Sequence, residues 1–434
     1  MRRRARCCRA ARRLAFHAWI MHGSCMDHAR SMHGAHMDAA GGIDIIGDIH
    51  GMHTRLVAML EVLGYRRRAG RWSHAEGRHI VFVGDYVDRG ARVAEVVELV
   101  RELCDHRVAL ALAGNHDTNA IAFATRAQDR AFDPAEAWRQ ATARLAAGPD
   151  AAPAPTAWLR PHDGKNLKQH QDTLRGFADA HGYDACVRHF MALPLYLELP
   201  GLRAVHAAWI PPAIHALDAW AAAKGVTAGI RAESIDEAIE IQRSRMAPDE
   251  RHWVELLDLG ARQQALDFAP DESVAIALER IVKGVEMRLP GEVRLADGGG
   301  HARGEMRIRW FDAAAGRTYH EHALTKAADT EKLRALLGDR RIDAREHSAE
   351  LPPLPTLVPY HPHDAYPADE RPVFFGHYAL FDAADRAFGK ILRANVACVD
   401  HGGGFAAGAL SAYRWSGERE LRLANFVTVD AKAD

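Results

Sequence analysis

Short apolar runs alternate with amphipathic stretches near the beginning of the chain. The runs Ile43–Gly47, His79–Val83 and Val108–Ala113 have the length and composition of buried strands. Between them, Thr54–Leu63 and Val93–Cys104 repeat Leu and Val at spacings of three and four residues, which predicts helices with one apolar face. The order strand, helix, strand, helix, strand predicts an α/β sheet with helices packed against it.

The rest of the chain is less regular. Residues 120–190 have mostly helical patterns, and residues 211–370 begin with charged helical patterns and continue with alternating segments such as Glu305–Trp310, which predict strands. We predict a hairpin of Leu195–Leu199 and Leu202–His206, a strand at Val373–Phe375, and closing antiparallel strands at Cys398–Asp400, Ala412–Trp415 and Asn425–Val429.

These patterns divide the chain into four parts. The expected parts are an N-terminal extension at 1–41, a core at 42–210 with a helical insertion at about 120–190, an insertion or cap at 211–370, and the C-terminal part of the core at 371–434. The extension is rich in Arg, and its apolar run Leu14–Met21 is interrupted by His17 without a clear cleavage site after it. It is therefore expected to be a disordered tail or the product of a start codon placed too early, rather than a signal peptide.

Composition narrows the classes of partner and compartment. The formal net charge of -1 gives no overall attraction to nucleic acid or to an anionic membrane. Nucleic acid therefore stays a possible but unfavoured partner. No apolar run approaches the ~20 residues that span a bilayer, so no membrane partner is expected. The six cysteines form no Cys-x-x-Cys pair, which fits a reducing cytoplasm.

A polar motif follows each of the first three predicted strands. These motifs are Asp48-Ile49-His50-Gly51, Gly84-Asp85-Tyr86-Val87-Asp88-Arg89-Gly90 and Gly114-Asn115-His116-Asp117. Two later histidines, His206 and His377, also follow apolar runs. Because open α/β sheets place ligands at the carboxyl ends of their strands, we expect these side chains to meet at one rim.

The residue types at this rim suit a pair of divalent metal ions. Hydrolysis of a phosphate ester needs a nucleophile at neutral pH, neutralisation of the phosphoryl charge and a proton for the leaving oxygen. Two metal ions ~3.5–4 Å apart supply the first two. Carboxylate, imidazole and amide oxygen ligands are accepted by Mn, Fe, Zn, Ni and Co alike. The sequence therefore indicates a metal-dependent hydrolase without identifying the metal.

The three motifs, together with Val205-His206 and Gly376-His377, resemble those of the calcineurin-like metallophosphoesterases. The continuation Val87-Asp88-Arg89-Gly90 is similar to that of the phosphoprotein phosphatase branch. That branch includes bacterial serine/threonine phosphatases, diadenosine tetraphosphatases and the phosphatase domain of polynucleotide kinase-phosphatases. The resemblance implies an αββα sandwich of two mixed sheets flanked by helices, here with two large insertions.

The resemblance also implies a role for each matching residue. The metal ligands would be Asp48, His50, Asp85, Asn115, His206 and His377, with Asp85 bridging two ions, of which Mn²⁺ is the first expectation. Arg89 would bind the substrate phosphate together with Asn115 and His116. His116 would protonate the leaving group, with Asp88 orienting its imidazole. Metal-bound water would attack phosphorus directly, without a phosphoenzyme.

Three alternatives stay open at this point. The expected substrate is a phosphate monoester such as a phosphoprotein, and the alternatives are a dinucleoside polyphosphate and the phosphorylated end of a polynucleotide. A non-catalytic metal-binding scaffold is the alternative from another class. A second phosphate-binding arginine is not assigned, although Arg307 and Arg309 share one face of a predicted strand.

Some residues depart from the family pattern or have no expected role. Asp117 stands where eukaryotic phosphatases have Glu, and Ala207-Ala208-Trp209 replaces a glycine pair after His206. The remaining histidines, which do not end a predicted strand, are expected to be surface or structural residues: His162, His170, His181, His189, His361 and His363. The run Gly402-Gly403-Gly404 is expected to be a hairpin or loop, not a phosphate cradle, because no helix follows it.

Overall fold

The computed structural model describes most of the chain after residue 40. The described residues are 41–148, 157–245, 250–263, 272–296, 302–314, 316–342, 366–381 and 390–430. The predictions for the N-terminal extension and for His361 and His363 lie outside these residues. No helix among them is long and apolar enough to cross a membrane.

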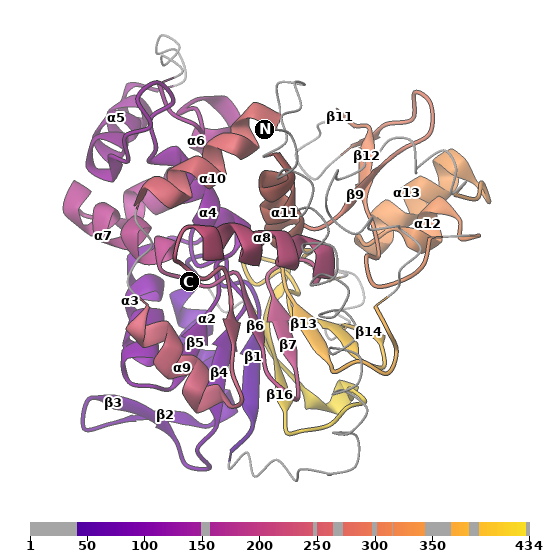
Figure 1. The fold of residues 1–434 in the computed structure, drawn as a ribbon, viewed down its shortest axis with the longest axis horizontal. Coiled ribbons are helices and arrows are strands. Elements are labelled where there is room, and N and C mark those ends of the chain that lie inside the picture. Colours follow the sequence, from indigo (N-terminus) through magenta and orange to yellow (C-terminus); the bar gives the residue numbers. More distant parts are fainter. Residues whose placement is uncertain are drawn as a thin grey trace, which may run out of the picture. The chain divides into compact units, whose positions relative to one another are not determined.

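Two mixed sheets form the centre of the fold (Figure 1). The first has the order β17-β16-β1-β4-β5, with bounds β1 (Ile43–Ile46), β4 (His79–Phe82), β5 (Ala109–Ala111), β16 (Ala409–Trp415) and β17 (Phe426–Asp430). In this sheet β1, β4 and β5 are parallel, and β16 and β17 are antiparallel to their neighbours. Residues from both ends of the chain therefore share one sheet.

The second sheet has six strands. Its order is β14-β15-β13-β7-β6-β8, with bounds β6 (Tyr196–Glu198), β7 (Arg203–Val205), β8 (Ile230–Arg231), β13 (Val373–Phe375), β14 (Lys390–Arg393) and β15 (Val396–Cys398). The predicted hairpin is confirmed, because β6 and β7 pair antiparallel. The predicted strand at Cys398–Asp400 has the wrong bounds, since β15 ends at Cys398. Of the two neighbours of β15, β14 pairs with it antiparallel, as predicted, and β13 pairs with it parallel.

Alternation along the strands separates two apolar layers. Ile45, Val81 and Leu110 of the first sheet belong to the same buried cluster as Leu197 and Phe374 of the second. This cluster is the layer between the sheets, because successive side chains of a strand point to opposite faces. The neighbouring residues point away from it, toward the helices: Ile46, Phe82 and Ala111 in the first sheet and Val205 and Phe375 in the second.

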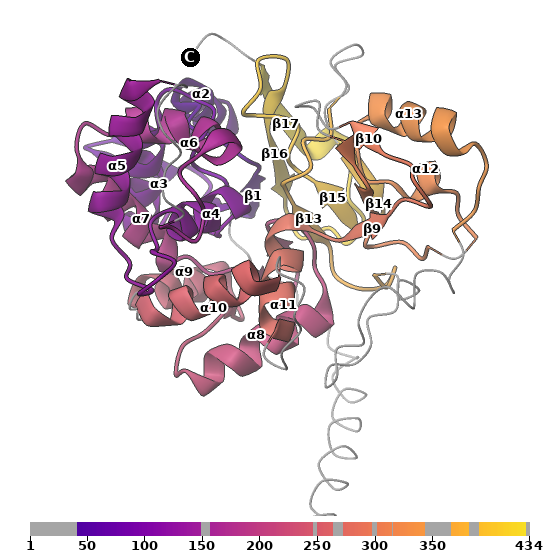
Figure 2. The ribbon, with the colours of Figure 1, turned by 90° about the horizontal axis from the view of Figure 1, so that it is seen from above.

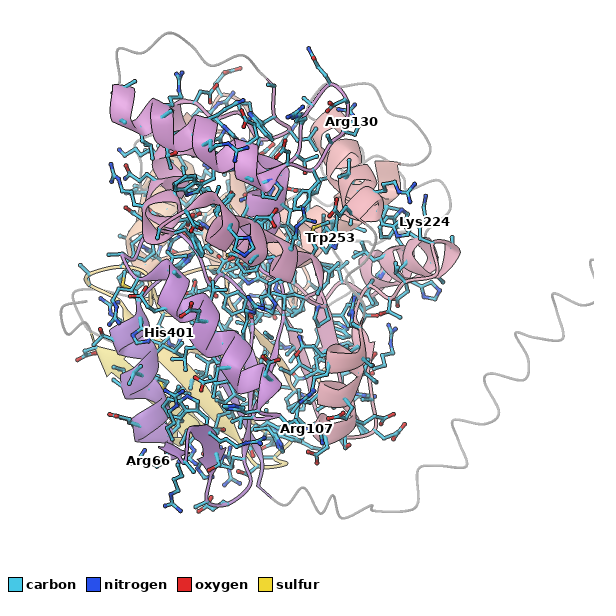
Figure 3. All side chains as sticks on the ribbon, turned by 90° about the vertical axis from the view of Figure 1, so that its left-hand side faces the viewer. Arg66, Arg107, Arg130, Lys224, Trp253 and His401 are labelled. Carbon is cyan, nitrogen blue, oxygen red and sulfur yellow. The ribbon has the colours of Figure 1, made fainter. Side chains whose placement is uncertain are left out.

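Helices cover the outer faces of both sheets. Against the first sheet lie α2 (His53–Leu63), which contacts β16 and β17, and α3 (Val93–Asp105), which contacts β5. The predicted apolar face of α3 is buried, including Val93, Val96 and Val100. A short ribbon of β2 (Tyr65–Arg68) and β3 (Arg71–His74) follows α2 at the end where Arg66 and Arg107 lie (Figure 3).

The region 120–190 is helical, as predicted. It contains the end of α4 (Asn115–Phe123) together with α5 (Pro134–Ala147), α6 (Gly164–Gly176) and nearly all of α7 (Ala180–Met191). Asp133 and Asp179 begin α5 and α7 by accepting backbone N–H groups of the first turn. Figure 2 shows this group of helices on the side of the sandwich that carries α2 and α3.

The region 211–370 covers the second sheet and also adds to it. Its elements are α8 (Pro211–Ala223), β8, α9 (Ile235–Ser244), α10 (Glu250–Gln263), α11 (Glu272–Lys283), β9 (Glu286–Arg288), β10 (Leu295–Ala296), β11 (Ala302–Arg303), β12 (Glu305–Arg307), α12 (Tyr319–His322) and α13 (Ala327–Leu337). Outside this region, the 3-10 turn η1 (Leu423–Asn425) precedes β17. Trp310 packs on Phe375 of β13 at a ring distance of 5.4 Å. The indole N–H of Trp253 in α10 donates to the carbonyl of Met191 at 2.7 Å (Figure 3). The expected αββα sandwich is therefore confirmed, with this region supplying one outer layer.

Candidate metal centre and active site

Five strand ends bring the polar motifs to one rim, as the sequence predicted. The positions after β1 and β4 hold Asp48, His50 and Asp85. Asn115 begins α4 after β5. His206 follows β7, and His377 follows β13 one residue later. The parallel pairing of β1, β4 and β5, and of β7 with β13, is what places these ends side by side.

The backbone of this rim is held in an unusual conformation. Asp85, Asp88, Arg89, His50 and His377 all have positive φ angles, between 50° and 72°. Few non-glycine residues adopt this region, and each such residue costs about 1–3 kcal/mol of strain. These residues are five of the nine non-glycine residues with positive φ in the described part of the chain. Strain concentrated in this way is typical of a functional site.

The Asp85 carboxylate lies between two groups of possible metal ligands. His50, Asp85 and His116 offer ligand atoms within 4.8 Å of one another, and so do Asp85, His206 and His377. The His50 Nε2 atom is 3.6 Å from Asp85 Oδ2, and the His206 Nε2 atom is 3.4 Å from Asp85 Oδ1. Each oxygen of the carboxylate therefore faces a different imidazole, which is the arrangement that a bridging ligand requires.

Two of the imidazoles are oriented by the backbone. The Nδ1–H of His50 donates to the carbonyl of Val87 at 2.8 Å, and the Nδ1–H of His206 donates to the carbonyl of Val83 at 2.8 Å. Each ring consequently presents the lone pair of Nε2 to Asp85. A hydrogen bond on the far nitrogen is the usual device that fixes the tautomer of a metal-binding histidine.

Asn115 and His377 complete the group on the His206 side. The Asn115 Oδ1 atom is 3.1 Å from His206 Nε2 and 2.8 Å from His377 Nδ1. Gly114 packs so closely on Asp85 that a Cβ atom there would lie 2.2 Å from Asp85 Oδ1. The start of α4 thus sets the position of the central carboxylate.

Asp48 carries a buried charge with little compensation from the protein. Burial, Asp400 and Asp85 all raise the pKa of Asp48 well above its usual value. Its oxygens accept the backbone N–H of His377 at 3.2 and 3.1 Å. Three buried carboxylates in one place favour a nearby cation, so the donor set fits divalent metal ions.

The histidines divide into two electrostatic classes. Burial lowers the pKa of His50, His206 and His377, with Arg307 contributing at His377. A neutral imidazole is the form that binds a metal ion. At His116 burial also opposes the charge, but Asp85 and the hydrogen bond to Asp88 outweigh it and raise the pKa. His116 is therefore the one imidazole of this site that is set up to carry a proton.

Asp88 is the centre of a network that the sequence did not reveal. Its Oδ2 atom accepts from His116 Nδ1 at 2.5 Å, and its Oδ1 atom accepts from His170 Nδ1 at 2.7 Å and from the Thr173 hydroxyl at 2.6 Å. Burial opposes the charge of Asp88, but His170 and His116 lower its pKa well below the usual value. The first insertion, through α6, thus fixes the carboxylate that orients His116. His170 was expected to be merely a surface or structural histidine.

Arg89 is available for an anionic group. Its guanidinium lies 4.3 Å from the centre of the Phe405 ring. No carboxylate of the described residues lies within the ion-pair limit of 4.0 Å from it. The glycine run beside it is a loop, as expected, but it belongs to the site. A Cβ atom at Gly404 would lie 2.7 Å from His50 and 2.9 Å from Arg89.

Arg307 and Arg309 differ in their surroundings. The Arg309 Nε atom is 2.6 Å from Asp312 Oδ2, so that guanidinium is already paired. The Arg307 guanidinium lies 5.6 Å from the centre of the ring of Tyr378, the residue that follows His377. Its Nε atom is 3.9 Å from Glu286 Oε1. Arg307 is thus the one of the two that lies next to the rim.

Comparison with known proteins agrees with this site. Residues 42–217 match the family model of the calcineurin-like phosphoesterases. The match to that family is confined to this part of the chain, which is less than half of its length. This part contains Asp48, His50, Asp85, Asn115 and His206, whereas His377 lies beyond it.

Relatives of known name match a short part of the chain. The chain is 41% identical over 73 residues to a bis(5'-nucleosyl)-tetraphosphatase PrpE of Halalkalibacterium halodurans and 45% identical over 74 residues to one of Oceanobacillus iheyensis. These matches cover 17% of this chain and 30% of each relative. A cold-active protein-tyrosine phosphatase of Shewanella sp. is 14% identical with a TM-score of 0.37, over 88% of this chain and 80% of that one.

The calcineurin-like phosphoesterase region departs from the family pattern at Asp117, and the structure gives this residue a structural role. Its carboxylate accepts the backbone N–H groups of Gly114, Asp85 and Tyr86 at 2.8, 2.9 and 3.1 Å. Asp117 therefore ties the loop after β4 to the first turn of α4.

Proposed function

We propose that the protein is a dinuclear-metal phosphoesterase that hydrolyses a phosphate monoester. The observation that supports this most directly is the position of Asp85, whose two oxygens face imidazoles of two different ligand groups. Asp48 and His50 would hold the first ion, and Asn115, His206 and His377 the second, with Asp85 shared. Mn²⁺ is the proposed metal, with Fe, Zn, Ni and Co as alternatives.

The metal ions, when bound, would supply an activated water molecule and neutralise the charge of the phosphoryl group. Arg89 would bind two oxygens of the substrate phosphate, since its guanidinium has the planar geometry for such a pair. His116 would carry a proton on Nε2 and donate it to the leaving oxygen. Asp88 would hold the His116 ring through Nδ1, and its own position is fixed by His170 and Thr173.

Two measurements test the proposal: turnover of a phosphate ester by the wild type, and turnover after removal of the proposed general acid, His116. The purified protein with Mn²⁺ is expected to hydrolyse p-nitrophenyl phosphate. His116→Asn is expected to lower kcat by about 10²–10⁴, the usual contribution of a general acid. The matched control is His181→Asn, because His181 is exposed on α7. Turnover by His116→Asn at the wild-type rate would reject the proposed acid. No turnover of any ester with two bound metals would favour the non-catalytic scaffold.

The likeness to bis(5'-nucleosyl)-tetraphosphatases favours a second candidate substrate, a dinucleoside polyphosphate. A panel of phosphoserine peptide, diadenosine tetraphosphate and 3′-phosphorylated oligonucleotide, each with several metals, separates the candidates. The monoester proposal predicts a higher kcat/KM on the phosphoserine peptide. A higher kcat/KM on diadenosine tetraphosphate would replace it with the second candidate.

A further inference from the structure

Lys326 lies next to the proposed phosphate-binding Arg89, although it comes from the region 211–370. Its Nζ atom is 4.8 Å from the centre of the Phe405 ring, the same ring that Arg89 approaches to 4.3 Å. It is also 4.3 Å from the centre of the Phe381 ring. Two cationic side chains from distant parts of the chain therefore meet at one aromatic ring.

The ring itself is held against the metal centre. Phe405 follows Gly404, which packs against His50 and Arg89. The buried Arg55 side chain donates to the carbonyls of Gly403 and Phe405, so the backbone of this loop is fixed. Lys326 and Arg89 thus approach one ring, which belongs to a loop that packs against His50 through Gly404.

The ammonium group of Lys326 has no direct anionic partner in the described part of the chain. No carboxylate there lies within the ion-pair limit of 4.0 Å from Nζ, although the side chain is half-buried. Asp400 and Asp329 act on it electrostatically, but the Asp400 oxygens accept the backbone N–H groups of Ala379 and Gly402, and Asp329 pairs with Lys332. Burial lowers the pKa of Lys326. A cation in this state favours an anionic ligand.

The backbone of Lys326 is fixed as well. Its carbonyl accepts the backbone N–H groups of Asp329 and Thr330, so Lys326 is the N-cap of α13. Leu324 donates to the carbonyl of Arg307, which connects this turn to β12. The second insertion therefore presents the ammonium group at a defined place beside Arg89.

We propose that Lys326 binds a second phosphate group of the substrate, next to the one held by Arg89, and so selects substrates that contain a phosphate chain. This inference rests on the dinuclear phosphoesterase site of the proposed function, and between its two candidate substrates it favours the second, the dinucleoside polyphosphate. A phosphoanhydride carries charge on consecutive phosphorus atoms, which suits two cations that share one ring. A phosphopeptide carries its next charge several bonds away at no fixed place, so it fits this pair less well.

The test measures binding and does not depend on turnover. The protein is loaded with Mn²⁺, freed of excess metal, and titrated calorimetrically with orthophosphate and with imidodiphosphate, a non-hydrolysable diphosphate. We expect imidodiphosphate to bind more tightly. Lys326→Ala is expected to reduce that preference about tenfold, the loss of one charge-assisted contact. Lys326→Arg should restore most of it.

Arg334→Ala is the matched control, because Arg334 lies on α13, is exposed and pairs with Glu331, which does not act on Lys326. An unchanged preference in Lys326→Ala, with an unchanged melting temperature, would overturn the proposal. Equal binding of both probes by the wild type would overturn it too, as would tighter binding of an acidic phosphoserine peptide than of imidodiphosphate. If imidodiphosphate is preferred through Lys326 but no ester is hydrolysed, the proposed function fails while this inference stands.

Discussion

At the scale of single residues, the site consists of side chains and backbone held in states that cost folding free energy, namely buried charge and positive φ angles. Asp48 is a buried carboxylate beside two others, and Asp85 has a φ angle of 57°. Their identities were predictable, because each ends an apolar run in a recognisable motif. The residues that hold these side chains in place were not predictable. His170 is a lone histidine in the sequence, and its partner Asp88 lies 82 positions away. Only the packing of α6 against the loop after β4 reveals that contact.

The hydroxyl of Thr173 offers a direct test of this support. It donates to Asp88 Oδ1 at 2.6 Å and accepts the Asp88 backbone N–H at 2.9 Å. Thr173→Val keeps the shape of the side chain but leaves the buried Asp88 N–H unpaired, which costs about 1–3 kcal/mol, and removes one of the two hydrogen bonds to Asp88 Oδ1. We expect kcat on p-nitrophenyl phosphate to fall about tenfold and its pH profile to shift. The control is Thr142→Val, whose hydroxyl donates only within α5. Equal kcat values and pH profiles for the two variants would contradict the role of Thr173.

A buried histidine away from the metal site makes stability depend on pH. His162 is stacked between Phe123 and Trp158, and its Nε2–H donates to the Phe123 carbonyl at 2.8 Å. Burial lowers the pKa of His162 from 6.5 to about 4. The unfolded chain therefore binds a proton between these values that the folded state does not, so stability is complete above pH 6.5 and falls toward pH 4.

We expect His162→Gln to remove this part of the acid sensitivity. Over the window, wild type should lose up to about 3 kcal/mol more unfolding free energy than the variant. Urea unfolding at several pH values measures the difference. His181→Gln, at an exposed position of α7, should keep the wild-type slope. Parallel pH curves for wild type and His162→Gln would show that His162 is not buried in its neutral form.

At the scale of elements, the strands β1, β4 and β5 and the helices α2 and α3 were predictable because their periodicity is strong, whereas the β2–β3 ribbon between them was not predicted. The second sheet was harder to predict. β8 is only two residues long, and it joins the sheet through parallel pairing with β6. β15 pairs antiparallel with β14 as expected, but its parallel pairing with β13 was not predicted. Residues 382–389, between β13 and β15, lie outside the described part of the chain. Short strands with non-local partners leave little periodic pattern in a sequence.

Gly284, the residue after α11, is in close contact with Tyr378, the residue after His377. Gly284 has a φ angle of 82°, and a Cβ atom there would lie 2.0 Å from the Tyr378 hydroxyl oxygen. We expect Gly284→Ala to displace Tyr378 and weaken binding of the second metal ion about tenfold or more, measured by metal titration. Gly291→Ala is the control, because Gly291 has a φ angle of 60° but open space around its Cβ position. Equal metal affinity in both variants would show that α11 does not support His377.

At the scale of the whole molecule, the second insertion serves the site as well as the fold. It covers one sheet through Trp310 and α11 and places Lys326 and Arg307 beside the rim. The sequence located this region but did not explain it, because its cations meet Arg89 and His377 only after folding. The chemistry is therefore set by the two sheets, and we propose that the selection of substrate is set by the insertion.

The most direct test of the central claim is the metal content of wild type and Asp85→Asn, measured by mass spectrometry together with turnover of p-nitrophenyl phosphate. We expect two metal ions per wild-type chain, because Asp85 faces both ligand groups. Asp85→Asn is expected to lose at least one ion and nearly all turnover while keeping the wild-type circular dichroism spectrum. Two bound ions and full activity in Asp85→Asn would contradict the claim that Asp85 bridges a dinuclear centre.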